Sequence, residues 1–168
     1  KKTETGEDYW AINPKGYVPA LGLDTGEVLT ENVAVLQYIA DRKPEAKLAP
    51  PAGTMERYRL VEWLAFINSE IHKSLSTFFK PNVPEEWQQS VRELLAKRLG
   101  FLQNVLNTRP YLMGDDFTIP DAYLFTVLRW HRKAGIDLAQ FPAVKSYYER
   151  VQSRPKVIEA LQAEGLMK

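Results

Sequence analysis

The segment around residue 120 restricts the possible folds more than any other part of the sequence. Residues 122–130 are almost wholly apolar, and Phe-Thr-Ile-Pro-Asp precedes them at 117–121. Thr118 as an N-cap and Asp121 three residues later form a variant of the capping box. Pro120 suits the first turn of a helix, where the N–H that it lacks would have no partner. Because a helix that is apolar on nearly all sides lies inside a bundle, the sequence predicts a helical bundle around this segment.

The rest of the sequence after residue 54 also has a helical pattern. Apolar residues recur at steps of three and four along two long segments, 54–80 and 84–106. A further helix follows from Phe141-Pro142 to Arg154, and a short one covers 157–164 before Gly165. The predicted buried residues of the two long helices are Tyr58, Val61, Leu64, Ile67, Ile71, Leu75, Phe78, Trp87, Val91, Leu94 or Leu95, Leu99, Leu102 and Leu106.

The first 45 residues have a different pattern. After a polar, turn-rich start, residues 18–23 and 27–30 read as short strands joined by the tight turn Asp24-Thr25-Gly26. A helix then opens at Thr30 or Glu31 and runs to about residue 40. The prolines and glycine between 43 and 54 are typical of a linker. We therefore predict a first domain at 1–45, a linker at 46–53 and an all-helical domain at 54–168.

The order β-β-α, with a proline entering the first strand, is that of the second half of a thioredoxin-like fold. A two-stranded hairpin with one helix is marginal on its own. We therefore expect a β-α-β unit of roughly 30 to 35 residues before Lys1, outside the sequence. The predicted fold class is α+β: the β-β-α half of a thioredoxin-like domain, followed by an all-α bundle.

Composition excludes several classes of function. The net charge is +1 and the basic residues are spread along the chain, which argues against a nucleic-acid partner. With two His and no Cys, neither a disulfide nor a zinc or other metal site is expected. No apolar stretch approaches the ~20 residues of a membrane span, and no signal-peptide pattern is present. These features fit a cytoplasmic protein without a membrane partner.

Several motifs in order resemble the glutathione transferase family. They are Asn-Pro-Lys-Gly-Tyr-Val-Pro-Ala-Leu at 13–21, Leu-Thr-Glu-Asn-Val-Ala-Val at 29–35, and Phe-Thr-Ile-Pro-Asp-Ala-Tyr at 117–123. Glu-Ile-His-Lys at 70–73 and Ala-Glu-Gly-Leu at 163–166 are similar to the bacterial beta class. The resemblance implies a homodimer that joins the thiol of reduced glutathione to a hydrophobic electrophile, or uses it to reduce a peroxide or a disulfide.

The resemblance also assigns glutathione-binding residues near the predicted hairpin. Val18-Pro19 matches the cis-proline of the family, where the backbone groups of Val18 would pair with the cysteinyl part of glutathione. An ordinary trans proline at the start of an edge strand is the alternative. Lys1 matches a lysine that holds the glycine carboxylate of glutathione.

Glu31 and Asn32 match the residues that hold the γ-glutamyl end of glutathione. The helix N-terminus would attract the carboxylate, and Glu31 would take the ammonium group. The same residues also fit simple N-capping by Thr30, with Glu31 in the first turn.

His72 is the predicted supporting catalytic residue, placed by the resemblance near the sulfur of glutathione. A lone histidine on a helix more often has a structural role, which is the alternative. Ser69 is predicted to contact the glutathione of its own or a neighbouring subunit, and Lys73 to be a solvated charge. Tyr123 and Trp130 are assigned to the core.

Two departures from the family pattern affect this interpretation. Ala65 stands where close relatives have an asparagine that reaches the partner's ligand. The main catalytic Cys or Ser of the beta class is expected before Lys1. A non-catalytic, glutathione-transferase-like binding protein is therefore the second hypothesis, and a truncated, inactive chain is the third.

Overall fold

The computed structural model describes residues 1–167. Its first part carries an antiparallel hairpin in which β1 (Ala20–Gly22) pairs with β2 (Val28–Thr30). The turn closes with a hydrogen bond from the Gly26 N–H to the Leu23 carbonyl (2.9 Å), and Gly26 supplies the positive φ that the turn needs. Helix α2 (Asn32–Asp41) follows. The predicted hairpin and helix are confirmed, although both strands are shorter than expected.

The polar start of the chain contains a short helix that the sequence did not predict. Helix α1 (Tyr9–Ile12) is capped by Asp8, whose carboxylate accepts the Trp10 N–H at 3.1 Å. Lys2 pairs with Asp8 in an isolated β-bridge. Local polar bonds of this kind organise the segment without a core of its own.

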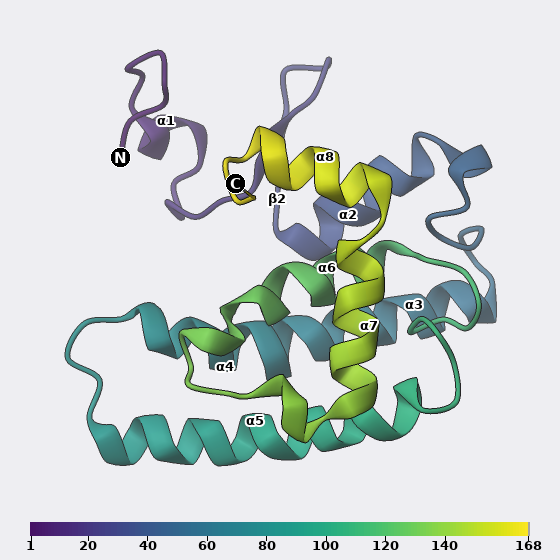
Figure 1. Ribbon diagram of the computed structural model, residues 1–168. Helices are drawn as coiled ribbons and strands as arrows, with labels where there is room; N and C mark the ends of the chain where they lie inside the picture. The colour runs from purple at the N-terminus through teal and green to yellow at the C-terminus, as the bar shows by residue number, and fades with distance from the viewer. Residues whose placement is uncertain (168) are drawn as a thin grey trace.

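The remainder of the described chain is helical (Figure 1). The α-helices are α3 (Met55–Phe66), α4 (Lys73–Ser76), α5 (Glu85–Leu106), α6 (Ile119–Leu128), α7 (Pro142–Gln152) and α8 (Pro155–Ala163). Shorter helical turns are η1 (Pro44–Ala46), η2 (Ile67–His72), η3 (Thr77–Phe79), η4 (Arg129–Arg132) and η5 (Leu138–Gln140). Helix α6 packs against α3, α7 and α2, and so joins the bundle to the first part of the chain.

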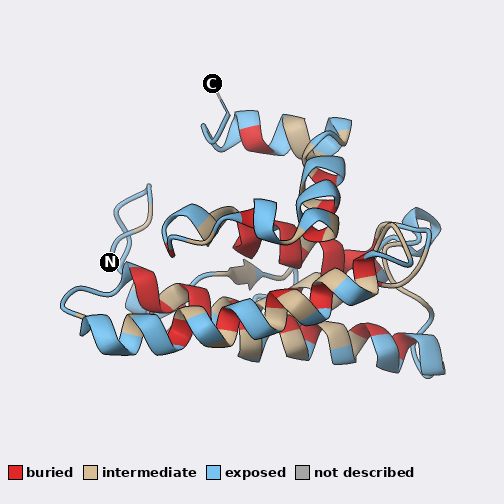
Figure 2. Cartoon of the chain, turned by 60° about the horizontal axis from the view of Figure 1, so that its bottom comes forward, coloured by how far each residue is buried: buried red, intermediate tan, exposed pale blue. Residues whose placement is uncertain are grey.

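Helix α6 is the buried centre that its sequence predicts. The predicted capping box is present, since Asp121 accepts the Thr118 N–H at 2.9 Å and its own N–H reaches the Thr118 carbonyl at 3.0 Å. The Asp121 carboxylate also accepts the Leu112 N–H (2.9 Å) and the Tyr147 hydroxyl (3.2 Å). Figure 2 shows buried residues around α6 and on the inner faces of α3 and α5.

The predicted burial of two core residues is wrong. Tyr58 is 61% exposed and Trp87 is 59% exposed, whereas Leu60 is fully buried. The first turn of α3 is rotated because Arg57 takes the inward position. Its guanidinium binds Asp41 and the Pro50 carbonyl, so Tyr58 faces outward.

The long helix predicted from 54 to 80 is not uniform. Segment η2 is a π-helix, in which the Lys73 N–H bonds the Asn68 carbonyl five residues back. Its inward residues, Ile67 and Ile71, are fully buried. Such π turns are often found at functional sites, and this one contains His72.

The predicted linker is tied down at several points. The Leu48 carbonyl accepts the Ile119 N–H at 3.0 Å, which pairs the first free N–H of α6. The Pro50 carbonyl accepts Arg57 Nε at 2.8 Å. Leu48 and Ala49 also pack against the core. Within residues 1–167, none of the helices has the length and apolarity to cross a membrane.

Candidate functional site

The loop before β1 holds the predicted cis-proline. The Val18–Pro19 peptide bond is cis, which confirms the predicted geometry and excludes the trans alternative. The loop is fixed at the Tyr17 carbonyl, which accepts the Tyr9 hydroxyl at 2.6 Å and Asn13 Nδ2 at 2.7 Å. Val18 itself is 76% exposed.

The backbone of Val18 is open to a ligand. Among residues 1–167, no hydrogen-bond partner is found for its N–H or its C=O. Lys1 lies beside the same loop, because its Nζ donates to the Gly16 carbonyl at 2.6 Å. Gly16 is required there, since a Cβ would meet the Trp10 ring at 2.4 Å and its φ is +68°. The structure therefore places Lys1 beside the loop that carries Val18 and Pro19.

The start of α2 has no side-chain cap. Its N-cap residue is Glu31, so the alternative of capping by Thr30 is wrong. The hydroxyl of Thr30 instead accepts Lys15 Nζ at 2.8 Å. In the described part of the chain, the N–H groups of Asn32 and Val33 lack acceptors. Such unpaired N–H groups at a helix N-terminus, together with the helix dipole, attract an anion.

Glu31 has a backbone conformation that is rare outside glycine. Its φ is +71° and its ψ is 119°, which costs free energy in any residue with a Cβ. Its carboxylate pairs with Lys15 Nζ, and both side chains are largely exposed. Lys15 lies inside the first family motif but was not among the predicted site residues.

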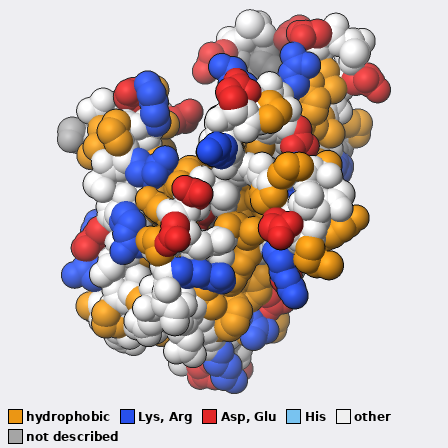
Figure 3. All heavy atoms as spheres, turned by 90° about the vertical axis from the view of Figure 1, so that its right-hand side faces the viewer, with side chains coloured by type: hydrophobic (Ala, Val, Ile, Leu, Met, Phe, Trp, Pro, Cys, Tyr) orange, Lys and Arg blue, Asp and Glu red, His pale blue; other side chains and the backbone are white. Residues whose placement is uncertain are grey.

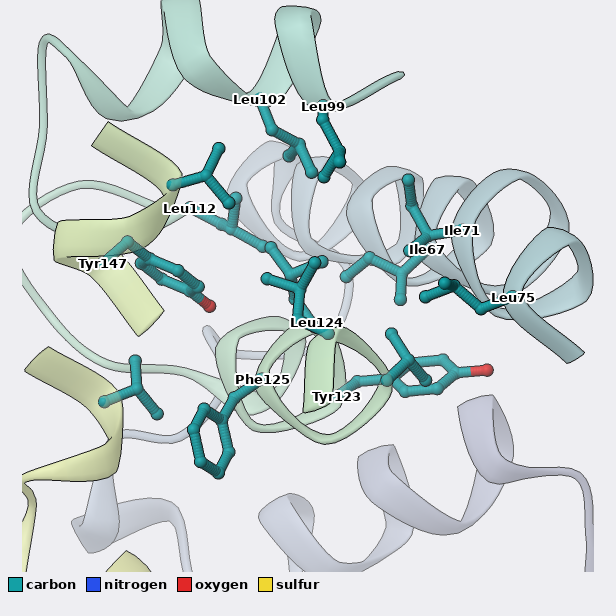
Figure 4. Packing of buried hydrophobic residues seen from close by; sticks show 14 of the residues in the cluster. Ile67, Ile71, Leu75, Leu99, Leu102, Leu112, Tyr123, Leu124, Phe125 and Tyr147 are labelled. Carbon is teal, nitrogen blue, oxygen red and sulfur yellow. The ribbon is translucent and has the colours of Figure 1, made fainter. Parts of the chain in front are cut away.

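His72 is linked to two residues that the sequence analysis did not assign to the site. Its Nδ1 lies 2.6 Å from the Tyr123 hydroxyl, which also lies 2.9 Å from Asn68 Oδ1. Tyr123 is 3% exposed, so its predicted place in the core is confirmed. Figure 4 shows its ring near Ile71 and Leu75, with the hydroxyl at the edge of the apolar cluster.

The pKa values connect His72 and Tyr123 with the start of α2. Burial lowers the pKa of His72, and the charge of Lys73 lowers it further. Burial raises the pKa of Tyr123 to about 12, while the Asn32 side chain lowers it and the Glu31 charge raises it. Tyr123 therefore lies close enough to Glu31 and Asn32 for both to affect its pKa, and it also bonds His72.

An aromatic group continues from His72. The Trp130 ring lies 5.0 Å from the His72 ring, and the Phe79 ring lies 5.0 Å from Trp130. Trp130 is only half-buried, so its assignment to the core is wrong in part. The group offers an apolar face next to the imidazole, because Phe79 is also exposed.

Ser69 is not brought into contact with these residues. It is exposed, and its hydroxyl donates to the Ala65 carbonyl of its own helix at 3.0 Å. Lys73 is exposed, as predicted.

Two surface cavities lie away from these residues. One, of about 550 Å³, is lined by η4, η5 and α7, and the other, of about 590 Å³, by the linker and residues 113–118. Neither includes a predicted site residue. On the face shown in Figure 3, basic and acidic side chains alternate between hydrophobic patches. Residues 1–167 contain no group of three or more His, Asp or Glu that could hold a metal ion.

Comparison with known proteins identifies the family. The family model described as glutathione S-transferase, N-terminal domain, matches residues 1–47, and that of the C-terminal domain matches residues 66–155. The chain is 45% identical over 166 residues to glutathione S-transferase GstA of Escherichia coli O157:H7, covering 99% of this chain and 83% of that protein. The chain belongs to the glutathione S-transferase family.

Solved structures of other glutathione S-transferases have the same fold. A sphingomonad glutathione S-transferase complexed with glutathione is 44% identical, with a TM-score of 0.94. The bacterial beta class enzyme of Sphingomonas chungbukensis is 45% identical, also with a TM-score of 0.94. Each comparison covers 99% of this chain and 83% of the other. The predicted family, its beta class and the predicted fold class are confirmed.

Proposed function

We propose that this member of the family is a glutathione transferase, which conjugates the thiol of reduced glutathione to hydrophobic electrophiles. The open backbone of Val18 beside the cis-proline is the observation that carries the proposal. A free N–H and C=O on one exposed residue can pair with a peptide ligand as an added strand does. Glutathione, with a cysteinyl peptide at its centre, fits this arrangement.

The groups on either side of Val18 suit the two ends of glutathione. The γ-glutamyl carboxylate would bind the free N–H groups at Asn32, and its ammonium group would bind Glu31 in competition with Lys15. At the other end, Lys1 would bind the glycine carboxylate. Pro19 fixes the direction of the chain between them.

His72 would support the chemistry as a proton acceptor. The S–H proton passes to the imidazole, and the thiolate attacks the electrophilic carbon and displaces its leaving group. The apolar face of Trp130 and Phe79 would hold the electrophile against the helical domain. A peroxide or disulfide would react with the same thiolate.

We also propose a homodimer in the cytoplasm, and the division into residues 1–45, 46–53 and 54–168. An aromatic cluster on the outer side of α3 and α5 supports the dimer. Phe101 is half-exposed, and its ring centroid lies 5.4 Å from that of Phe66 and 5.9 Å from that of Trp63. Aromatic residues are enriched at protein interfaces. Ser69, on the exposed side of the same long helix, would contact the glutathione of its own or the neighbouring subunit.

Calorimetry with reduced glutathione and a conjugation assay with an aryl halide test the proposal on the full-length protein. We expect binding, and turnover that a His72→Ala substitution lowers by about 100-fold. Because Lys80 is exposed and its side chain has no hydrogen bond or ion pair with the proposed site residues within residues 1–167, Lys80→Ala serves as the control. A protein that does not bind glutathione is a non-catalytic relative. If His72→Ala retains full activity, the role given to His72 is wrong.

A further inference from the structure

The hydroxyl of Tyr123 forms hydrogen bonds with His72 and Asn68 and lies near the side chain of Asn32, but it has only one proton to donate. His72 Nδ1 is 2.6 Å away and Asn68 Oδ1 is 2.9 Å away. An amide oxygen can only accept a hydrogen bond, whereas an imidazole nitrogen can donate or accept. The hydroxyl therefore donates to Asn68, and its oxygen is left to accept a proton from His72. This allocation places the imidazole proton on Nδ1.

We propose that Asn68 and Tyr123 are positioning residues that hold neutral His72 as its Nδ1–H tautomer, so that Nε2 presents a lone pair to the thiol of glutathione. The inference rests on the proposed function for the identity of the thiol. The inference goes beyond the proposed function because it names the imidazole nitrogen of His72 that takes the thiol proton. In the step itself, the S–H proton moves to Nε2, and the imidazolium keeps its Nδ1–H bond to Tyr123.

The surroundings of the two residues favour the same allocation. With its pKa raised to about 12, mainly by burial, Tyr123 keeps its proton at any working pH. The pKa of His72 is lowered by burial and by Lys73, so its imidazole is neutral near pH 7. Within residues 1–167, Nε2 of His72 has no hydrogen-bond partner.

Packing also fixes the plane of the His72 ring. The Tyr123 ring meets it at 87° with centroids 5.6 Å apart, and the Trp130 ring meets it at 66° with centroids 5.0 Å apart. A half-turn of the imidazole would replace Nδ1 with a carbon and leave the Tyr123 oxygen without its donor. The π turn η2 carries both Asn68 and His72, so a single backbone feature presents both residues to Tyr123.

The other histidine of the chain serves as an internal reference. His131 Nδ1 lies 2.7 Å from the Ile136 carbonyl oxygen, which can only accept, so His131 must also carry its proton on Nδ1. The ring centroids of His131 and Tyr148 lie 6.1 Å apart in an edge-on arrangement, much as those of His72 and Tyr123 do. The Tyr148 hydroxyl, however, forms no hydrogen bond with His131 in the described part of the chain.

Nitrogen NMR of the full-length protein with ¹⁵N-labelled imidazoles tests the proposal without an activity measurement. His72→Gln and His131→Gln variants assign the signals. Near pH 8, we expect the nitrogen signals of His72 to match those of His131, with Nδ1 protonated and Nε2 unprotonated. A protonated Nε2 on His72 overturns the proposal.

Substitutions of the exposed Asn68 sharpen the test, because they leave the core intact. In Asn68→Leu the Tyr123 hydroxyl loses the amide acceptor, and His72 Nδ1, at 2.6 Å, is the nearest acceptor left for its proton. The tautomer should therefore switch to Nε2–H, and kcat should fall by about tenfold. Asn68→Asp keeps an acceptor and should retain the Nδ1–H form. A tautomer that does not change in Asn68→Leu contradicts the proposal.

Tyr123→Phe and Tyr148→Phe form a matched pair. The first should mix the tautomers of His72 and lower kcat while the Kd for glutathione stays the same. The second should change neither. If the tautomers behave as stated but the protein does not bind glutathione, the proposed function fails and the positioning role stands. If Tyr123→Phe leaves the His72 signals unchanged, the positioning role is wrong.

Discussion

The first 45 residues and the helical bundle contribute to the site in opposite ways. In the first region, the described buried apolar residues are Val35 and Ala40, and the groups offered to a ligand are unpaired backbone groups at Val18 and Asn32. The bundle buries a continuous core and contributes a side chain, His72, held by buried or partly buried partners. Strained turns set the ligand geometry in one region, and packing sets the orientation of a side chain in the other.

The comparison also shows where stability resides. Buried apolar area is the main favourable term in folding, and it is concentrated around α6. The site segments of the first region depend on individual polar bonds and on backbone conformations that cost free energy. We therefore expect substitutions in the two regions to have effects of different size and sign.

The largest effect is expected at the centre of α6. Leu124 is fully buried, so Leu124→Ala should lower the free energy of unfolding by about 2–5 kcal/mol, from lost burial and the cavity that remains. Urea denaturation measures it, and Trp87→Ala, on an exposed face, should change it by less than about 0.5 kcal/mol. A loss below about 1 kcal/mol for Leu124→Ala would mean that α6 is not the stabilising centre.

The second effect concerns the polar centre of the same region. Asp121→Asn would place an amide N–H₂ among groups that already donate to the carboxylate, the N–H groups of Leu112 and Thr118 and the Tyr147 hydroxyl. The free energy of unfolding should fall by about 2–3 kcal/mol. Asp116→Asn, on the exposed loop before α6, is the matched control, and equal effects of the two substitutions would exclude the proposed role of the network.

In the first region, one substitution should raise the free energy of unfolding, whereas the two substitutions above lower it. Glu31→Gly relieves the positive φ and should raise the free energy of unfolding by about 1 kcal/mol, because the lost surface ion pair with Lys15 contributes little. The same variant should bind glutathione more weakly. Glu27→Gly in the same hairpin has no such strain to relieve and should be neutral or destabilising. A destabilised Glu31→Gly would show that the Glu31 backbone is unstrained.

The smallest effect should appear in the pH dependence of conjugation. Burial and, to a smaller extent, the charge of Lys73 lower the pKa of His72, so Lys73→Met should raise that pKa part of the way toward its ordinary value. The imidazole would then be protonated at a higher pH, and the loss of kcat on acidification should begin higher by a few tenths of a pH unit. Lys80→Met is the control, and a shift to lower pH would contradict the assignment.

The sequence predicted the elements whose formation depends on local chemistry. The capping box at Thr118, the turn at Gly26 and the order of the helices follow from residue types at fixed spacings, and each is present. The cis form of Pro19 came from the family resemblance, since spacing alone favours neither isomer.

The parts that the sequence did not predict depend on contacts between distant segments. Arg57 is inward because Asp41 and the Pro50 carbonyl lie there, and this turned Tyr58 outward against its periodicity. Tyr123 was assigned to the core on apolar pattern, which cannot show that its hydroxyl emerges beside His72. The π turn left only a weak sign, two successive steps of four from Ile67 to Ile71 and Leu75.

The anchored linker has a consequence for how the site recognises its substrates. The Leu48 carbonyl is bonded to the Ile119 N–H, and swinging the first 45 residues away from the bundle would break the ion pair between Asp41 and Arg57. These two contacts hold α2 and the linker against the bundle. In the proposed site, the shape and polarity of side chains such as Trp130 and Phe79 would discriminate among electrophiles.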